Sequence, residues 1–164
     1  TLFRSRSSDL YLTQLKKALA QKLLSEGIGH TEFRDSEVGR IPVEWEVMSI
    51  AELTEKIVGG GTPSREIKEY FAGDIPWVTV KDMGNEKYKK DATEHITMDA
   101  VHNSAVKIVE ANNVIISTRM GLGRCFINLV NMAINQDLKG LFIDKEIMLT
   151  KYFMYCYRDR KSVV

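Results

Sequence analysis

At 164 residues, the chain is long enough for one ordinary domain with an appendage and too short for two full domains. Hydrophobic residues at 44% and charged residues at 27% exclude disorder and fibrous structure as the overall state, because both values are ordinary for globular chains. The formal net charge of +1 does not by itself indicate a nucleic-acid binder, so any contact with DNA must come from basic side chains gathered on one surface.

The two ends of the chain have sequences that the same DNA could encode when it is read on opposite strands. These segments are residues 1–5, Thr-Leu-Phe-Arg-Ser, and residues 159–164, Asp-Arg-Lys-Ser-Val-Val. We interpret both as translated adapter DNA, so they take no part in the prediction of the fold. The biological chain is then expected to span about residues 6–158.

An amphipathic helix is predicted between residues 9 and 26. Its apolar positions recur at three- and four-residue steps, and lysine and glutamine residues lie opposite them. Gly27 and Gly29 are expected to end the helix. A lone helix of this length is marginal in water, so the stripe needs a partner, either the following domain or another helix in a coiled coil. The leucine spacing does not decide between these two. The stripe consists of Leu12, Leu15, Leu19 and Leu23.

The next segment, up to residue 42, is rich in glycine and charge and indicates a linker into a new domain. Short strands and short helices then alternate without a regular βαβ rhythm, which favours an α+β fold. Thr62, Thr97 and Asp144 are the expected helix caps. An entry strand and a short turn are predicted at residues 45–53, strands at residues 74–80, 113–118, 124–130 and 138–143, and helices at residues 64–71, 97–104 and 145–157.

Residues 59–64, Gly-Gly-Gly-Thr-Pro-Ser, place flexible backbone ahead of a predicted helix, where N–H groups can bind a phosphate. The segment is not a nucleotide-binding loop, because the Gly-Lys-Ser/Thr ending of that loop and the spaced glycines of the dinucleotide fingerprint are both missing. A plain turn and a contact with DNA phosphate are about equally compatible with it.

Two later segments combine glycines with side chains that can contact DNA. Residues 117–124 place two arginines around glycines, and arginine binds phosphate in a fork or guanine through two hydrogen bonds. Residues 135–137, Asn-Gln-Asp, supply amides that can pair with adenine edges or simply brace a loop. A hairpin turn and buried amide bracing are the corresponding structural interpretations.

The sequence shows no pattern for bond-breaking chemistry, so we expect no enzyme activity, no cofactor and no metal. Glu66 and Lys68 have the Glu-x-Lys spacing of some nucleases, but they fall in a predicted helix without an upstream Pro-Asp pair. The histidines lack metal-ligand spacing, and Cys125 and Cys156 stand alone. No apolar run approaches the roughly 18 residues that span a bilayer, and no secretory signal is visible, so a cytoplasmic location is expected.

Five segments in order resemble the target recognition domains of type I restriction-modification specificity subunits. Residues 15–24 resemble the end of the helical spacer of the same family. The resemblance covers nearly all of residues 10–158. The five segments are residues 33–45, 60–64, 73–83, 117–123 and 135–139.

The resemblance implies a subunit whose two recognition domains are separated by long antiparallel helices that fix the distance between two half-sites. Each domain reads one half of a split double-stranded DNA sequence, methyltransferase subunits dock on the helices, and a motor-nuclease subunit joins for cleavage. Residues 6–28 would then be the spacer helix and residues 29–44 a linker. Residues 45–158 would be a recognition domain without its C-terminal remainder.

Within this framework we expect the chain to recognise DNA and to catalyse nothing. The leucine stripe would be the interface with partner helices. The rival hypothesis is a scaffold that holds methyltransferase subunits and reads no DNA. The DNA-binding candidates are Lys81, Arg119, Gly121, Arg124, Gln136 and Lys139, with Thr62 and Ser64 as weaker phosphate contacts.

Overall fold

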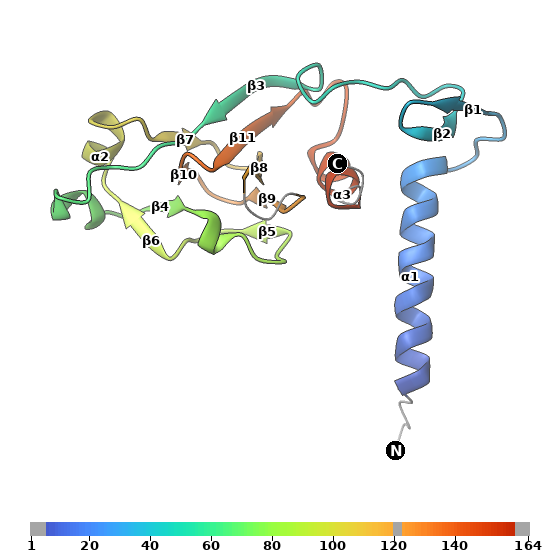
Figure 1. Cartoon of the computed structure of the whole chain (residues 1–164), viewed down its shortest axis with the longest axis horizontal. Coiled ribbons are helices and arrows are strands. Elements are labelled where there is room, and N and C mark those ends of the chain that lie inside the picture. The colour runs from blue at the N-terminus through green and yellow to red at the C-terminus, as the bar shows by residue number, and fades with distance from the viewer. Residues whose placement is uncertain (1–5, 120–122, 160–164) are drawn as a thin grey trace. The chain divides into compact units, whose positions relative to one another are not determined.

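Helix α1, Arg6–Glu26, confirms the helix predicted from the leucine spacing (Figure 1). The computed structural model describes residues 6–119 and 123–159. Gly27 follows α1 with a φ of +69° and ends it, as expected for a residue without a side chain in the left-handed region. The leucine stripe stays exposed to solvent. The exposed fractions are 48% for Leu12, 50% for Leu15, 55% for Leu19 and 38% for Leu23.

A β-hairpin that the sequence did not predict follows α1. It consists of β1, Phe33–Ser36, and β2, Gly39–Pro42, paired antiparallel with Ser36 opposite Gly39. The hydroxyl of Ser36 donates a hydrogen bond of 2.6 Å to the carbonyl of Gly39 and closes the turn. The linker was predicted from the glycine and charge content of this segment, and its two turn residues, Glu37 and Val38, are not the Asn-Gly or Asp-Gly pair that marks a tight hairpin.

Contacts along the chain separate an N-terminal unit, Thr1–Met48, from a C-terminal unit, Ser49–Val164. The N-terminal unit holds α1 and the hairpin, and the remaining elements belong to the C-terminal unit. The strands of the C-terminal unit are β3 (Thr54–Gly59), β4 (Ile75–Val78), β5 (Tyr88–Lys89), β6 (Glu94–Ile96), β7 (Lys107–Val109), β8 (Val114–Ser117), β9 (Cys125–Asn128), β10 (Met132–Ile134) and β11 (Leu138–Ile143). Its helical segments are η1 (Lys68–Phe71), η2 (Val80–Asp82), α2 (Met98–His102) and α3 (Thr150–Asp159).

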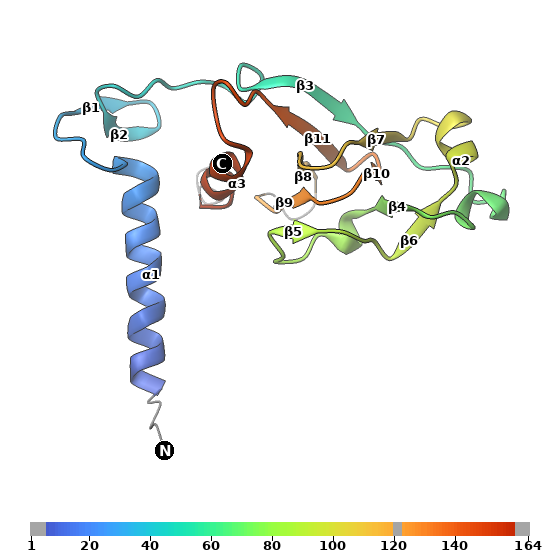
Figure 2. The same ribbon diagram turned by 180° about the vertical axis from the view of Figure 1, so that it is seen from behind.

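The strands of the C-terminal unit form two sheets (Figure 2). One sheet has the order β6-β4-β10-β7 and the other the order β3-β11-β8-β9-β5. The pairs β4–β10 and β5–β9 are parallel and the others are antiparallel. This mixture of short strands and helices confirms the α+β fold class. No helix in residues 6–119 and 123–159 is long and apolar enough to cross a membrane.

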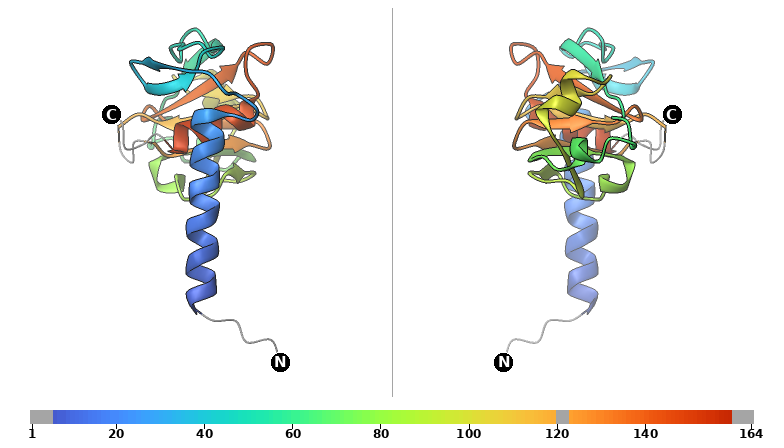
Figure 3. Two further views of the ribbon diagram at one scale, coloured as in Figure 1. Left: turned by 90° about the vertical axis from the view of Figure 1, so that its right-hand side faces the viewer. Right: turned by 90° about the vertical axis from the view of Figure 1, so that its left-hand side faces the viewer.

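Alternation along β4 and β10 divides the core between the two faces of the four-stranded sheet. Val78 and Ile134 face a cluster shared with Ile115 of β8 and Phe126 of β9, so this cluster joins the two sheets. Trp77 and Ala133 point to the other face, where a second cluster includes residues of η1 and α2. The right panel of Figure 3 looks onto α2 from that side.

Several predicted elements are confirmed, β11 with the predicted bounds and the others with shorter ones. Strands expected at residues 74–80, 113–118, 124–130 and 138–143 are β4, β8, β9 and β11. The helix expected from Thr97 is α2, and the Thr97 hydroxyl caps it by accepting a 3.2 Å hydrogen bond from the backbone N–H of Ala100.

Three predicted elements differ from the structure. Of the entry strand and short turn expected at residues 45–53, the strand is wrong and the turn lies at residues 50–53, and β3 starts at Thr54. The helix expected at residues 64–71 is reduced to η1, because the Thr62 hydroxyl bonds Gln136 and does not cap a helix. The last helix starts at Thr150, because Asp144 accepts a hydrogen bond from the Glu146 backbone and closes a turn there.

Candidate nucleic-acid interface

Strand registers place the ends of several strands along one edge of the C-terminal unit. Strands β4 and β10 are parallel and both end at this edge, where the N–H of Asn135 donates to the carbonyl of Val78 at 3.0 Å. Strand β11 begins here, with Leu138 opposite the last residue of β8 and Lys139 opposite the last residue of β3. The loops after β3, β4, β8 and β10 therefore emerge together.

Three of these loops contact one another directly. We call residues 60–62, 117–119 and 135–137 the three-loop cluster. The N–H of Gly61 donates to the carbonyl of Ile134 at 3.0 Å, and the N–H of Thr118 donates to the carbonyl of Asp137 at 3.0 Å. The cluster thus brings together segments that the sequence analysis selected separately.

The glycines of the first loop allow this close approach. A Cβ added at Gly60 would overlap the backbone carbonyl of Ile134, and one added at Gly61 would lie 2.6 Å from the backbone of Ala105. No helix begins at Thr62, so the helix expected directly after the glycines is missing, and a contact of this segment with DNA phosphate stays a prediction. These two glycines instead allow the segment that directly follows β3 to lie against the loop that follows β10.

Thr62 and Gln136, two of the predicted contacts, are joined by a hydrogen bond in which the Thr62 hydroxyl donates to the Gln136 Oε1 at 2.6 Å. Both residues are exposed. The bond links the loops after β3 and β10 and fixes one end of the glutamine amide.

Arg119 lies at the same edge and is held on one side only. Its Nη1 lies 3.3 Å from the Asp137 carboxylate, and its side chain is 70% exposed. The carboxylate also accepts a 3.2 Å hydrogen bond from the Asn135 amide. An exposed ion pair of this kind contributes at most about 1 kcal/mol, so Arg119 can exchange it for a phosphate at little cost.

Lys139 and Lys81 add two more exposed cations on the segments next to the cluster. Lys139 is exposed on β11, and within the described part of the chain its ammonium group takes part in no ion pair or hydrogen bond. Lys81 is exposed in η2, three residues after the end of β4. Its segment is fixed by Asp82, whose carboxylate accepts hydrogen bonds from the backbone and hydroxyls of Thr79 and Thr93.

Other basic residues are committed to the fold. Arg124 donates to the carbonyl of Met83 at 2.9 Å and holds the segment after η2. Arg65 pairs with Glu94 through two hydrogen bonds and lies over the rings of Phe71 and Trp77. The hydrogen bond from Arg65 lowers the pKa of the Glu94 carboxyl, and burial opposes it only in part. These two arginines are less available to DNA than Arg119.

Of the two remaining candidates, Ser64 does not join the cluster. The Ser64 hydroxyl accepts a 3.4 Å hydrogen bond from the backbone of Glu66 within its own turn. Gly121 lies outside the described residues. The sequence analysis missed Asp82 as an organising residue, although the Thr-x-x-Asp spacing from Thr79 is the signature of a capping box.

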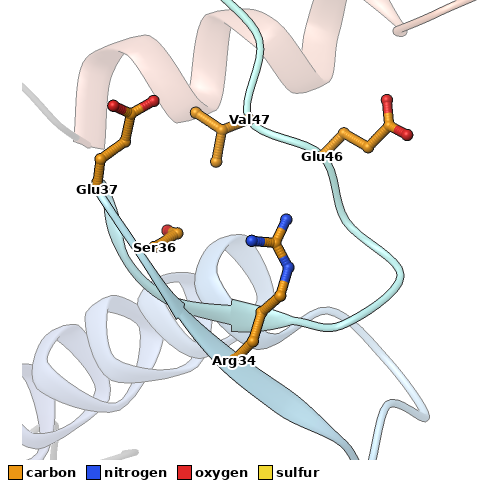
Figure 4. A pocket seen from close by; sticks show the side chains of 5 residues that line it. All are labelled: Arg34, Ser36, Glu37, Glu46 and Val47. Carbon is orange, nitrogen blue, oxygen red and sulfur yellow. The ribbon is translucent and has the colours of Figure 1, made fainter.

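A separate hollow in the N-terminal unit has a different character. Arg34, Glu37 and Glu46 line it together with Ser36 and Val47, as Figure 4 shows. The Arg34 guanidinium donates to the carbonyl of Trp45 at 2.8 Å, so this cation is already engaged, and two carboxylates flank it. The hollow does not favour a nucleic acid. No group of three His, Cys, Asp or Glu side chains that could hold a metal ion occurs in residues 6–119 and 123–159.

Comparison with known proteins identifies similar sequences. Residues 42–163 match a family model described as the type I restriction modification DNA specificity domain. The MjaIX specificity subunit of Methanocaldococcus jannaschii, a type I restriction enzyme subunit, is 33% identical over 132 residues, covering 79% of this chain and 30% of that protein. The EcoR124I/EcoR124II specificity subunit of Escherichia coli is 35% identical over 126 residues, covering 73% of this chain. The chain spans 30% of the length of each of these relatives.

A solved structure shows the same fold. The HsdS subunit from Thermoanaerobacter tengcongensis superposes with a TM-score of 0.66 at 16% sequence identity, covering 96% of this chain and 36% of that chain. The likeness extends over α1 and the two sheets because nearly the whole chain is aligned.

Proposed function

This chain belongs to the type I restriction modification DNA specificity family, and on that premise we propose that its C-terminal unit is a target recognition domain for double-stranded DNA. In this proposal residues 45–158 form the domain, read one half of a split target and catalyse no reaction. The domain directs methyltransferase subunits and a motor-nuclease subunit to that target.

The observation that carries the proposal is the gathering of unpaired or weakly paired cations around Gln136 at one edge. Arg119, Lys139 and Lys81 supply charge for DNA phosphates, which position a protein on the duplex without reading sequence. Gln136 supplies an amide that can contact a base edge. Because the net charge of the chain is only +1, this local concentration is what makes DNA binding electrostatically favourable.

Replacing Arg119 with alanine in the complete subunit is expected to weaken binding to all duplexes by a similar factor. Each lost phosphate contact removes about one unit from the slope of log K against log salt concentration. Duplex binding measured across a salt series checks both effects. The folded state should be unaffected, because Arg119 is 70% exposed and its ion pair is weak.

Lys145→Ala is the matched control, since it removes the same charge beyond the other end of β11 and is also exposed. It should leave affinity and salt slope close to those of the parent protein. An Arg119→Ala variant that binds with the parent affinity and slope would remove Arg119 from the interface. Retention of a methyltransferase partner without any DNA binding at low salt would favour the rival scaffold function.

We further propose that residues 6–28 form a spacer helix whose leucine stripe docks partner helices. The stripe is apolar and exposed along α1, and burial of one leucine contributes about 2 kcal/mol. A helix of this length is marginally stable when it is isolated, and it gains most of its stability from such packing.

Leu19→Asp is expected to weaken capture of the methyltransferase subunit by about thirtyfold, the equivalent of that burial energy. Co-purification at graded partner concentrations measures the loss. Gln21→Asp introduces the same carboxylate on the opposite side of α1 and should have little effect. Equal capture by both variants would show that the stripe faces no partner.

A further inference from the structure

The orientation of the Gln136 amide is fixed by a residue from a distant part of the chain. The Thr62 hydroxyl donates to Oε1 of Gln136 at 2.6 Å across 74 residues of sequence. Thr62 is itself held in place, because the neighbouring Gly61 donates to the carbonyl of Ile134 and accepts a hydrogen bond from the Trp77 indole at 3.2 Å.

The backbone of Gln136 is equally constrained. The Asn135 N–H donates to Val78, the Asp137 N–H donates to the Asn135 side chain at 3.2 Å, and the Leu138 N–H donates to the Asn135 carbonyl at 3.2 Å. These bonds fix the backbone from which the Gln136 side chain extends, and the Thr62 bond holds the far end of that side chain, its amide.

The consequence is a defined polarity at the exposed end of the amide. The oxygen faces Thr62, so the NH2 group is the part left to contact a ligand. Within residues 6–119 and 123–159 this NH2 group makes no hydrogen bond. Without the Thr62 hydroxyl, the amide could turn over and offer oxygen and nitrogen equally.

We propose that Thr62 is a positioning residue that turns the NH2 group of Gln136 outward, as a donor to a base carrying an exocyclic carbonyl, guanine or thymine. This inference rests on the proposed function as a DNA recognition domain. In the major groove, guanine presents the acceptors O6 and N7 and thymine presents O4, whereas cytosine presents an exocyclic amine and adenine presents its amine beside the acceptor N7. An outward NH2 group bonds the carbonyls of guanine and thymine, faces another donor at cytosine, and at adenine bonds only N7 and leaves the amine without an acceptor. The two-bond adenine pairing that the sequence suggested would also need the amide oxygen to face the base, and that oxygen is turned toward Thr62.

Selection of bound duplexes from a randomised pool tests the inference with the complete subunit. The parent protein should enrich guanine or thymine at one position by about tenfold or more, the usual size of one base contact. Gln136→Glu replaces the donor with an acceptor and should shift that position alone to adenine or cytosine. The enriched base itself distinguishes guanine from thymine.

Thr62→Val removes the hydroxyl at nearly constant volume and should abolish the discrimination at that position. Thr62→Ser should retain it, and thermal unfolding and salt slope should be the same in all three proteins. Parent-like selection by both Thr62→Val and Gln136→Glu would overturn the inference while leaving the proposed function intact. A parent protein without preference at any position would overturn the proposed function and the inference together.

Discussion

Gly60→Ala is expected to destabilise the C-terminal unit by about 3 kcal/mol or more. The added Cβ would overlap the carbonyl oxygen of Ile134 and lie 2.5 Å from that of Asn135. Both are backbone atoms, so the overlap is relieved only if the segment that follows β3 separates from the loop after β10. Urea unfolding followed by circular dichroism measures the loss. The same separation would break the Thr62–Gln136 bond, so selectivity should fall along with stability.

The adjacent residue provides the control. Gly59→Ala makes the same chemical change one position earlier, where the nearest atom to the added Cβ is the Lys139 Nζ at 3.9 Å. This separation is an ordinary van der Waals contact, so the free energy of unfolding of the variant should lie within about 0.5 kcal/mol of that of the parent. Similar unfolding midpoints for the two variants would show that the first loop does not pack as tightly as the structure indicates.

Elements with strong local signals were predictable from the sequence. Helix α1 has a leucine period that persists over several turns, and Gly27 ends it in a conformation that glycine favours. Strand β8, which is buried along its whole length, reads as a continuous apolar run. In both cases the local pattern is enough to predict the element, although β8 is held in the sheet by its pairing with β9 and β11.

Elements that depend on distant partners were not predictable. Strand β10 has three residues, and it is a strand because β4 and β7, both much earlier in the chain, pair with it on its two sides. The helix expected at residues 64–71 failed for the same reason. Its proposed cap, Thr62, forms a hydrogen bond with a residue 74 positions away.

The candidate residues of the interface were selected from the sequence, but their arrangement in space was not predicted. Arg119, Gln136 and Lys139 were chosen for their chemistry, and the registers of β3, β8 and β11 bring their loops together. The difference between Arg119, which is 70% exposed, and Arg124, which holds the Met83 carbonyl, has no sequence signal. Both arginines flank the same glycine-containing stretch of sequence, and only the tertiary contacts separate their roles.

Asp82 organises the segment that carries Lys81, and its charge is essential to that role. Its carboxylate accepts four hydrogen bonds, from the N–H and hydroxyl groups of Thr79 and Thr93, at 2.6 to 3.0 Å. Burial raises the pKa of the Asp82 carboxyl, but the bonds from Thr93 and Thr79 together outweigh burial and hold the pKa below its ordinary value. The ionised form is therefore the one that the fold stabilises.

Asp82→Ala is expected to cost about 3 kcal/mol at pH 7, because it leaves the N–H groups of Thr79 and Thr93 without their acceptor. The contribution should be complete above the unfolded-state pKa, about 3.9, and should decline as the pH falls through the lower pKa of the folded state. The difference in unfolding free energy between parent and variant should therefore narrow in acid, as urea unfolding at pH 7, 5 and 3 can measure. Asp74→Ala, at an exposed carboxylate, should track the parent throughout. If the difference in unfolding free energy between the parent and Asp82→Ala stays constant down to pH 3, the four hydrogen bonds do not depend on the charge of Asp82.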